Sequence, residues 1–121
     1  MLPEIIKLKQ WAKQIKKIWR HPIYLVGSAL HKAHPRDWDI RVELPAAQFR
    51  RLVGPIRGWE KKMNNGKWEE TEQRWSNICV GFWHDGCDKT GLNIDFQFYP
   101  QSYCKKNFKG LPKRKLARFL L

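Results

Sequence analysis

Apolar positions recur along the chain with two different periods, which predicts alternating helices and strands. Between residues 3 and 20 they return every three or four residues, as on one side of an amphipathic helix. These positions are Ile5, Leu8, Ala12, Ile15 and Trp19. Pro3 suits a first helical turn, and His21-Pro22 ends the segment. We expect this helix to pack on a sheet and to present its lysines to solvent. The alternative is that the lysine face contacts a membrane surface or RNA.

Three later segments have the patterns of strands. Residues 23–26 form a continuous apolar run, typical of a buried strand. Residues 38–44 alternate, which sets Asp37, Asp39, Arg41 and Glu43 on one face and Trp38, Ile40, Val42 and Leu44 on the other. Residues 92–98 alternate in the same way, so Leu92, Ile94, Phe96 and Phe98 should face the core and Asp95 should face away from it.

Helices are predicted between these strands. A short one is expected over residues 29–33, and a second opens at Pro45 and ends at Gly54-Pro55 or Gly58. A third is expected over residues 67–84, followed by turns at Asp85-Gly86 and Gly91. A final helix could begin at Pro112 and bury Leu116, Phe119 and Leu120. This order predicts one α/β domain over residues 1–121, a short mixed β-sheet flanked by helices.

The residues that could carry chemistry follow the first strand and begin the second. Gly27 and Ser28 should form a tight turn whose serine caps the next helix, and the N-terminus of a helix attracts phosphate. Asp37 and Asp39 share a face, and clustered carboxylates repel each other unless a cation such as Mg²⁺ lies between them. The alternative is that both are turn residues after Pro35. We favour the first interpretation, which implies nucleotide chemistry.

The strand is followed by Gly27-Ser28, a short helix and Asp37-Trp38-Asp39. This order resembles the signature of the nucleotidyltransferase superfamily, which includes DNA polymerase β-like palms and minimal nucleotidyltransferases. That family has a third carboxylate on a later strand, and Asp95 is the matching position. The resemblance covers about residues 23–99. It implies a polymerase-palm-like domain in which Asp37, Asp39 and Asp95 are catalytic and hold two Mg²⁺ ions.

The resemblance also implies a reaction and its substrates. A nucleoside monophosphate would pass from an NTP, such as ATP, to an acceptor hydroxyl, with Gly27 and Ser28 holding the β and γ phosphates. Lys32 and Arg36 could contact the triphosphate as charge-assisted donors, or could be surface charges. Minimal members of the family occur with helical partners in toxin-antitoxin pairs.

The charge of the chain favours RNA as the acceptor. Lys and Arg number 24 against 11 Asp and Glu, a net charge of +13, which suggests a polyanionic partner. The basic C-terminal segment, residues 103–121, contains no acid and is the predicted grip on a phosphate backbone. We expect an RNA acceptor such as a tRNA end. The alternatives are adenylylation of a partner protein and a non-catalytic nucleic-acid-binding module on the same fold.

Cysteine and hydropathy patterns bear on the compartment. The three cysteines are an odd number without a paired Cys-x-x-Cys spacing, so neither a disulfide framework nor a zinc ribbon is indicated. A reducing, cytoplasmic location fits this best. No apolar run approaches the roughly 20 residues of a membrane helix, so no membrane partner is expected.

Overall fold

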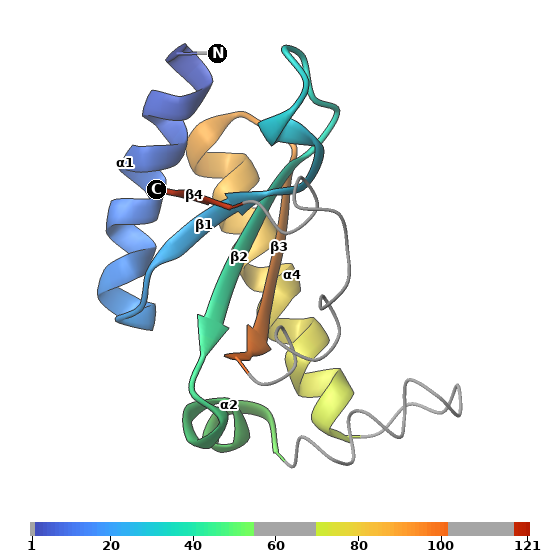
Figure 1. The fold of residues 1–121 in the computed structure, drawn as a ribbon. Coiled ribbons are helices and arrows are strands. Elements are labelled where there is room, and N and C mark those ends of the chain that lie inside the picture. Colours follow the sequence, from blue (N-terminus) through green and yellow to red (C-terminus); the bar gives the residue numbers. More distant parts are fainter. Residues whose placement is uncertain (1, 55–69, 102–117) are drawn as a thin grey trace.

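The computed structural model describes residues 2–54, 70–101 and 118–121. Their elements, in chain order, are α1 (Leu2–Trp19), β1 (Ile23–Val26), the 3-10 helix η1 (Gly27–Leu30), β2 (Trp38–Leu44), α2 (Ala46–Val53), α4 (Glu70–Thr90), β3 (Ile94–Pro100) and β4 (Phe119–Leu120). The strands form one mixed sheet in the order β3-β2-β1-β4 (Figure 1). The predicted α/β class and mixed sheet are therefore confirmed.

The direction of the strands places the ends of β2 and β3 together. β1 pairs antiparallel with both β2 and β4, whereas β2 and β3 run parallel. A parallel pair needs a long crossover, and α2 and α4 lie between these two strands in sequence. Residues that begin β2 and β3 therefore meet at the same end of the sheet.

The core lies between one face of the sheet and the helices α1 and α4. Trp19 of α1 packs on Phe96 and Phe98 of β3, with ring centroids 5.6 and 5.0 Å apart, and Phe82 of α4 stacks on Phe96 at 4.9 Å. The core residues of the three longer strands are Ile23, Leu25, Trp38, Ile40, Val42, Leu44, Ile94, Phe96 and Phe98. This confirms the alternation predicted for β2 and β3, although Leu92 lies before β3 and is only partly buried, and the polar side chains project from the opposite face. β1, predicted as a continuously buried strand, also alternates between buried and half-buried positions.

Helix α1 is amphipathic as expected. Leu8, Ala12, Ile15 and Trp19 are buried, and its lysines are exposed. Trp11, outside the predicted apolar side, is also buried, and its indole Nε1–H donates to Asp85 Oδ2 at 2.9 Å. No helix among the described residues is long and apolar enough to cross a membrane.

Helix α4 is longer than its sequence pattern predicts. It continues through Asp85-Gly86 to Thr90, so the predicted turn at Asp85-Gly86 is wrong. Gly86 is buried within the helix, and a Cβ there would lie 2.8 Å from the Trp11 ring. A glycine costs a helix interior about 1 kcal/mol relative to alanine, but here it allows α1 and α4 to approach closely. Gly91, with a φ of +71°, follows the helix end and retains its predicted turn role.

The C-terminal residues form a strand instead of the expected helix. Residues 102–117, including the predicted start at Pro112 and most of the basic segment, lie outside the described residues. Phe119 and Leu120 form β4 and are 41% and 57% exposed, so the prediction that they bury one edge of a helix is wrong. Pairing with β1 explains the difference, because Leu121 N–H donates to Ile23 O at 2.9 Å. Arg118 also donates to both carboxylate oxygens of Glu43 at 2.9 Å.

Candidate active site

The polar face of the sheet brings Asp39 and Asp95 side by side. The parallel register sets Asp39 of β2 directly opposite Asp95 of β3. Because alternate residues of neighbouring strands point to the same face, both carboxyl groups project away from the core. The two side chains share a hydrogen bond. Residues far apart in the sequence are thus adjacent in the fold.

This proximity changes the acid-base behaviour of Asp39. Partial burial, followed by the negative charges of Asp95 and Asp37, raises the pKa of Asp39 from 3.8 to about 6. The hydrogen bond with Asp95 acts in the same direction, because a shared proton replaces one of two repelling charges. We call Asp37, Asp39 and Asp95 the acid cluster. The acid cluster therefore favours a proton or a cation between its carboxylates.

Asp37 lies just before β2 and is held by Asn93, the residue just before β3. Its Oδ1 accepts a hydrogen bond from Asn93 Nδ2, and Asn93 O accepts from Trp38 N–H at 2.8 Å. Asn93 therefore joins the start of β2 to the start of β3. In the part of the chain that the structure describes, no three His, Cys, Asp or Glu side chains form a group that could hold a metal ion as they stand. Asp37 is close enough to affect Asp39 but is directed toward Asn93.

Gly27 is in direct contact with the acid cluster. It has a φ of +75°, a conformation that glycine adopts without strain. A Cβ at this position would lie 2.2 Å from Asp39 Oδ2. Any larger residue would therefore displace the carboxylate of Asp39. Because Gly27 has no side chain, the turn after β1 lies close enough to Asp39 of β2 to form one site with it.

Ser28 does not have the capping role that the sequence predicts. The N-cap of η1 is Val26, without a side-chain hydrogen bond. Ser28 instead accepts from the N–H groups of His31 and Lys32 through its backbone carbonyl, both at 3.0 Å. The predicted helix over residues 29–33 is this single 3-10 turn at residues 27–30, so it lacks the dipole of a longer helix. The phosphate role of Gly27 and Ser28 stays a prediction.

The two predicted phosphate contacts lie in the segment that joins η1 to β2. Lys32 and Arg36 are both exposed. The backbone carbonyl of Arg36 accepts from Asn93 Nδ2 at 3.5 Å, which places this part of the segment beside the start of β3. Both cations are therefore accessible to a ligand, and their contact with a triphosphate stays a prediction.

Two hollows meet at Asp95. One, of about 270 Å³, lies on the polar face and is lined by Asp39, Asp95, Arg41, Gln97 and Tyr99, together with Val26 and Ile40. The other, of about 330 Å³, extends toward α4 and is lined by Asp37, Asn93, Asp95, Val80 and Trp83, with Cys79, Ile94 and Phe96 beneath. The first combines acids with a cation, and the second offers a flat indole ring that is 40% exposed. Such surroundings suit a phosphorylated ligand and an aromatic ring respectively.

The sequence patterns did not identify two residues of this site. Arg41 lies two positions after Asp39 on the same strand face, and Asn93 lies two positions before Asp95. The alternation places each of them near an acid. It does not indicate that Asn93 would donate to Asp37, because that contact depends on the register between two strands.

Comparison of the chain with models of known protein families, with curated proteins and with solved structures gave no match. The chemistry of the acid cluster and of the two hollows therefore carries the functional argument.

Proposed function

We propose that this chain is a Mg²⁺-dependent nucleotidyltransferase that transfers a nucleoside monophosphate from an NTP to a hydroxyl of RNA. The observation that carries the proposal is the pairing of Asp39 with Asp95 across two parallel strands, with Asp37 near and Gly27 in contact. Carboxylates with a raised pKa beside accessible hollows are typical of functional sites. The resemblance of the same residues to nucleotidyltransferases supports this choice of reaction.

The donor set of the cluster suits Mg²⁺. Hard divalent cations take carboxylate oxygens, and the negative charges of Asp95 and Asp37 contribute to the raised pKa of Asp39. A cation would relieve this repulsion. Asp37, Asp39 and Asp95 would hold the metal, with Asp37 exchanging its bond to Asn93 for a metal contact. Bound Mg²⁺ supplies charge stabilisation at the transferred phosphate and a lower pKa for the acceptor hydroxyl.

The remaining residues would bind the two substrates on either side of Asp95. Gly27 and Ser28 lie on the β1 side of the cluster, and exposed Lys32 and Arg36 provide cationic donors for the triphosphate. The acceptor would then enter from the β3 side, where the second hollow adjoins Asp95. A net charge of +13 supports RNA over a protein as this acceptor.

The test is incubation with each α-labelled NTP and Mg²⁺ in the presence of total cellular RNA and protein. We expect label in the RNA fraction. Loss of Asp39 or Asp95 should reduce transfer by at least about a thousandfold, because each residue would act directly on the reacting groups. Asp39→Asn and Asp95→Asn should therefore be inactive, and chelation with EDTA should have the same effect.

The matched control is Asp88→Asn, which neutralises an exposed carboxylate of α4 that lines neither hollow. This variant should transfer like the parent. Full activity of Asp39→Asn would refute the mechanism, and label confined to protein would replace RNA by a protein acceptor. Absence of label from every fraction, with every nucleotide, would favour a non-catalytic binding module.

A further inference from the structure

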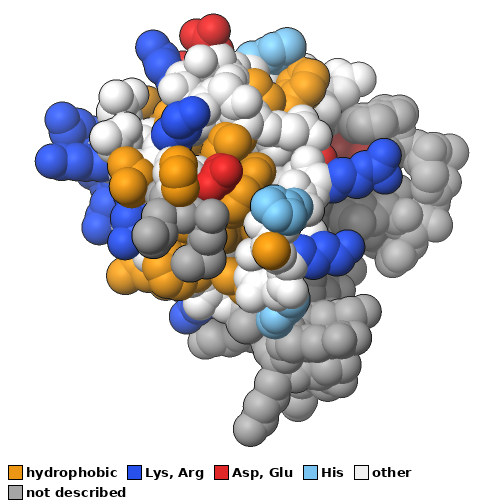
Figure 2. Space-filling model, turned by 90° about the horizontal axis from the view of Figure 1, so that it is seen from above, with side chains coloured by type: hydrophobic (Ala, Val, Ile, Leu, Met, Phe, Trp, Pro, Cys, Tyr) orange, Lys and Arg blue, Asp and Glu red, His pale blue; other side chains and the backbone are white. Residues whose placement is uncertain are grey.

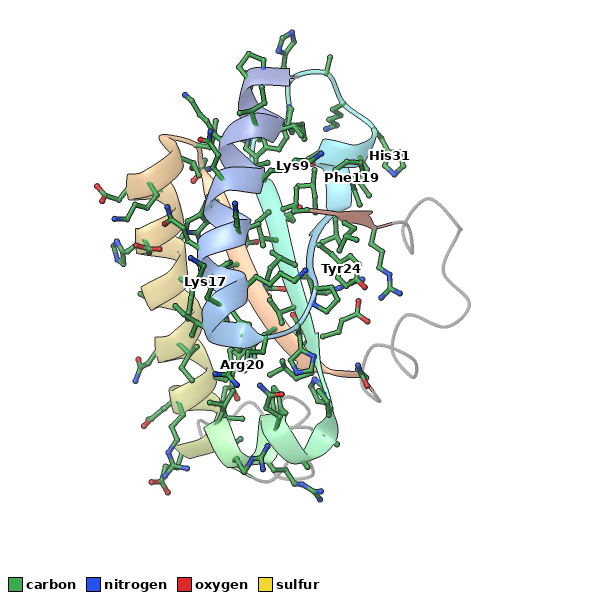
Figure 3. The ribbon with its side chains drawn as sticks, turned by 90° about the vertical axis from the view of Figure 1, so that its left-hand side faces the viewer. Lys9, Lys17, Arg20, Tyr24, His31 and Phe119 are labelled. Atoms are coloured by element: carbon green, nitrogen blue, oxygen red, sulfur yellow. The ribbon has the colours of Figure 1, made fainter. Side chains whose placement is uncertain are left out.

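One side of α1 is a continuous row of positive charge, which we call the lysine stripe. It consists of Lys9, Lys13, Lys16 and Lys17, all of them exposed, and Arg20 follows the end of the helix. Their spacing of one, three and four residues places the four lysines along one side of the helix, over about 12 Å from eight steps of about 1.5 Å. Figure 3 looks onto this side of α1 and labels Lys9, Lys17 and Arg20.

No acid adjoins the lysine stripe in the sequence, because residues 5–36 contain neither Asp nor Glu. In the view from above, Lys and Arg side chains gather at the border where α1 lies in Figure 1 (Figure 2). A row of cations attracts a polyanion and gains free energy when condensed counterions are released.

An aromatic ring of β4 lies beside the lysine stripe. Lys9 Nζ lies 5.6 Å from the ring centroid of Phe119. Phe119 is 41% exposed, and Figure 3 shows it next to Lys9. An exposed ring among cations suits single-stranded nucleic acid, because an unpaired base can stack on the ring while the phosphates contact Lys and Arg.

We propose that the lysine stripe, together with Phe119, is a binding surface for single-stranded nucleic acid. Phosphates of consecutive nucleotides lie along α1, and at least one base stacks on Phe119. The proposal goes beyond the reaction above, because it concerns binding alone and requires no chemistry at Asp39. It also places a basic surface for nucleic acid outside the C-terminal segment, residues 103–121, which the sequence pattern predicts to bind a phosphate backbone.

An anionic membrane is the other polyanion that a lysine-rich helix could meet. A helix that binds a membrane surface inserts an apolar side, but the apolar side of α1 is buried in the core. Among the described side chains of α1, the large apolar residues Ile6 and Ile18 are 55% and 68% exposed. They lie roughly 120° apart around the helix, twelve steps of about 100° each, so they form no common face. The arrangement favours nucleic acid.

The experiment measures the affinity of the full chain for a fluorescein-labelled, single-stranded RNA oligonucleotide across a series of salt concentrations. The test variant carries Lys13→Gln and Lys17→Gln, in the centre of the lysine stripe. The control carries Arg50→Gln and Arg51→Gln, which remove the same charge from exposed positions of α2. The slope of log affinity against log salt should become shallower by about 1.4 in the test variant, about 0.7 for each lost phosphate contact.

The control should keep the slope of the parent. Phe119→Ala should weaken binding about tenfold without changing the slope, because stacking does not release counterions. Equal slopes for the stripe and control variants, or no binding by the parent, would overturn the proposal. So would stripe-dependent binding to vesicles of phosphatidylserine and phosphatidylcholine that the oligonucleotide does not displace. Active transfer without this binding would refute the surface and leave the proposed reaction intact.

Discussion

At the scale of single residues, burial and neighbouring charge act together on the carboxyl group of Asp39. Its carboxyl group is partly buried, is hydrogen-bonded to Asp95, and experiences the charge of Asp37. These influences favour the protonated form and raise its pKa to about 6. A carboxylate that is disfavoured in its ionised form destabilises the fold at neutral pH unless a cation binds it. The residue that would hold Mg²⁺ in the proposed reaction is therefore one that lowers stability while the cation is absent.

The first prediction follows from the sign of that pKa shift. The pKa of Asp39 is higher in the folded chain than its ordinary value of 3.8, so its stabilising contribution is complete below about pH 4 and is lost as pH rises through about 6. In EDTA at pH 7.5, Asp39→Asn should therefore be more stable than the parent, by on the order of 1 kcal/mol after allowance for solvent screening. Urea unfolding at pH 7.5 and at pH 4 tests this.

At pH 4 the two proteins should have nearly equal free energies of unfolding, because the parent Asp39 is then protonated. A variant that is less stable than the parent by the same amount at both pH values would show that Asp39 has a structural role unrelated to its charge.

At the scale of elements, the 3-10 helix η1 and the helix α4 contain glycines of opposite kinds. Gly27 has a positive φ and leaves no room for a Cβ against Asp39, whereas a methyl group at Gly81 of α4 would meet nothing within 4 Å. The first glycine is required by backbone conformation and contact. The second only lowers the stability of a helix.

The second prediction compares alanine at these two positions. Gly27→Ala should destabilise the chain by about 2 kcal/mol, because a non-glycine residue at this φ is strained and its methyl group would collide with Asp39. Gly81→Ala should stabilise it by about 0.5–1 kcal/mol through helix propensity. Thermal unfolding followed by circular dichroism measures both. A neutral Gly27→Ala would show that η1 moves away from Asp39 at little cost.

At the scale of the whole molecule, the sheet separates two tasks. Its apolar face holds α1 and α4 through a cluster of aromatic rings, and its polar face carries the acids. The acid cluster is a local concentration of negative charge in a chain whose net charge is +13. The rest of the chain is positively charged and repels cations. A cation therefore binds at the acid cluster only if the negative charges of its carboxylates add together.

The third prediction concerns the response of the whole fold to Mg²⁺. A ligand that binds only the folded state at ten times its dissociation constant stabilises it by about 1.4 kcal/mol, which raises the Tm of a domain this size by about 5 °C. The parent and Asp88→Asn should show this rise at pH 7.5. The double variant Asp39→Asn, Asp95→Asn should show none. An equal rise in all three proteins would place Mg²⁺ elsewhere, whatever the activity measurements show.

Much of the secondary structure could be predicted from local patterns. The alternation over residues 38–44 identified both faces of β2, and the apolar positions of residues 3–20 identified the buried side of α1. Local conformational preference and burial together decided these elements, and both depend on residues that are close to one another in the sequence. The predictions failed where distant contacts outweighed local preference. Gly86 is helical because Trp11 packs on it, and Phe119 is in a strand because β1 offers a partner.

The sequence by itself determined which side chains are available at the candidate site, since Asp37, Asp39 and Asp95 all lie on polar positions of alternating segments. Only the tertiary structure decided how they meet. The parallel register pairs Asp39 with Asp95, Asn93 directs Asp37, and a glycine without a side chain brings η1 against the cluster. Periodicity specifies the face on which a residue lies, whereas the neighbour it meets depends on strand order and register. Those are set by the packing of the whole core.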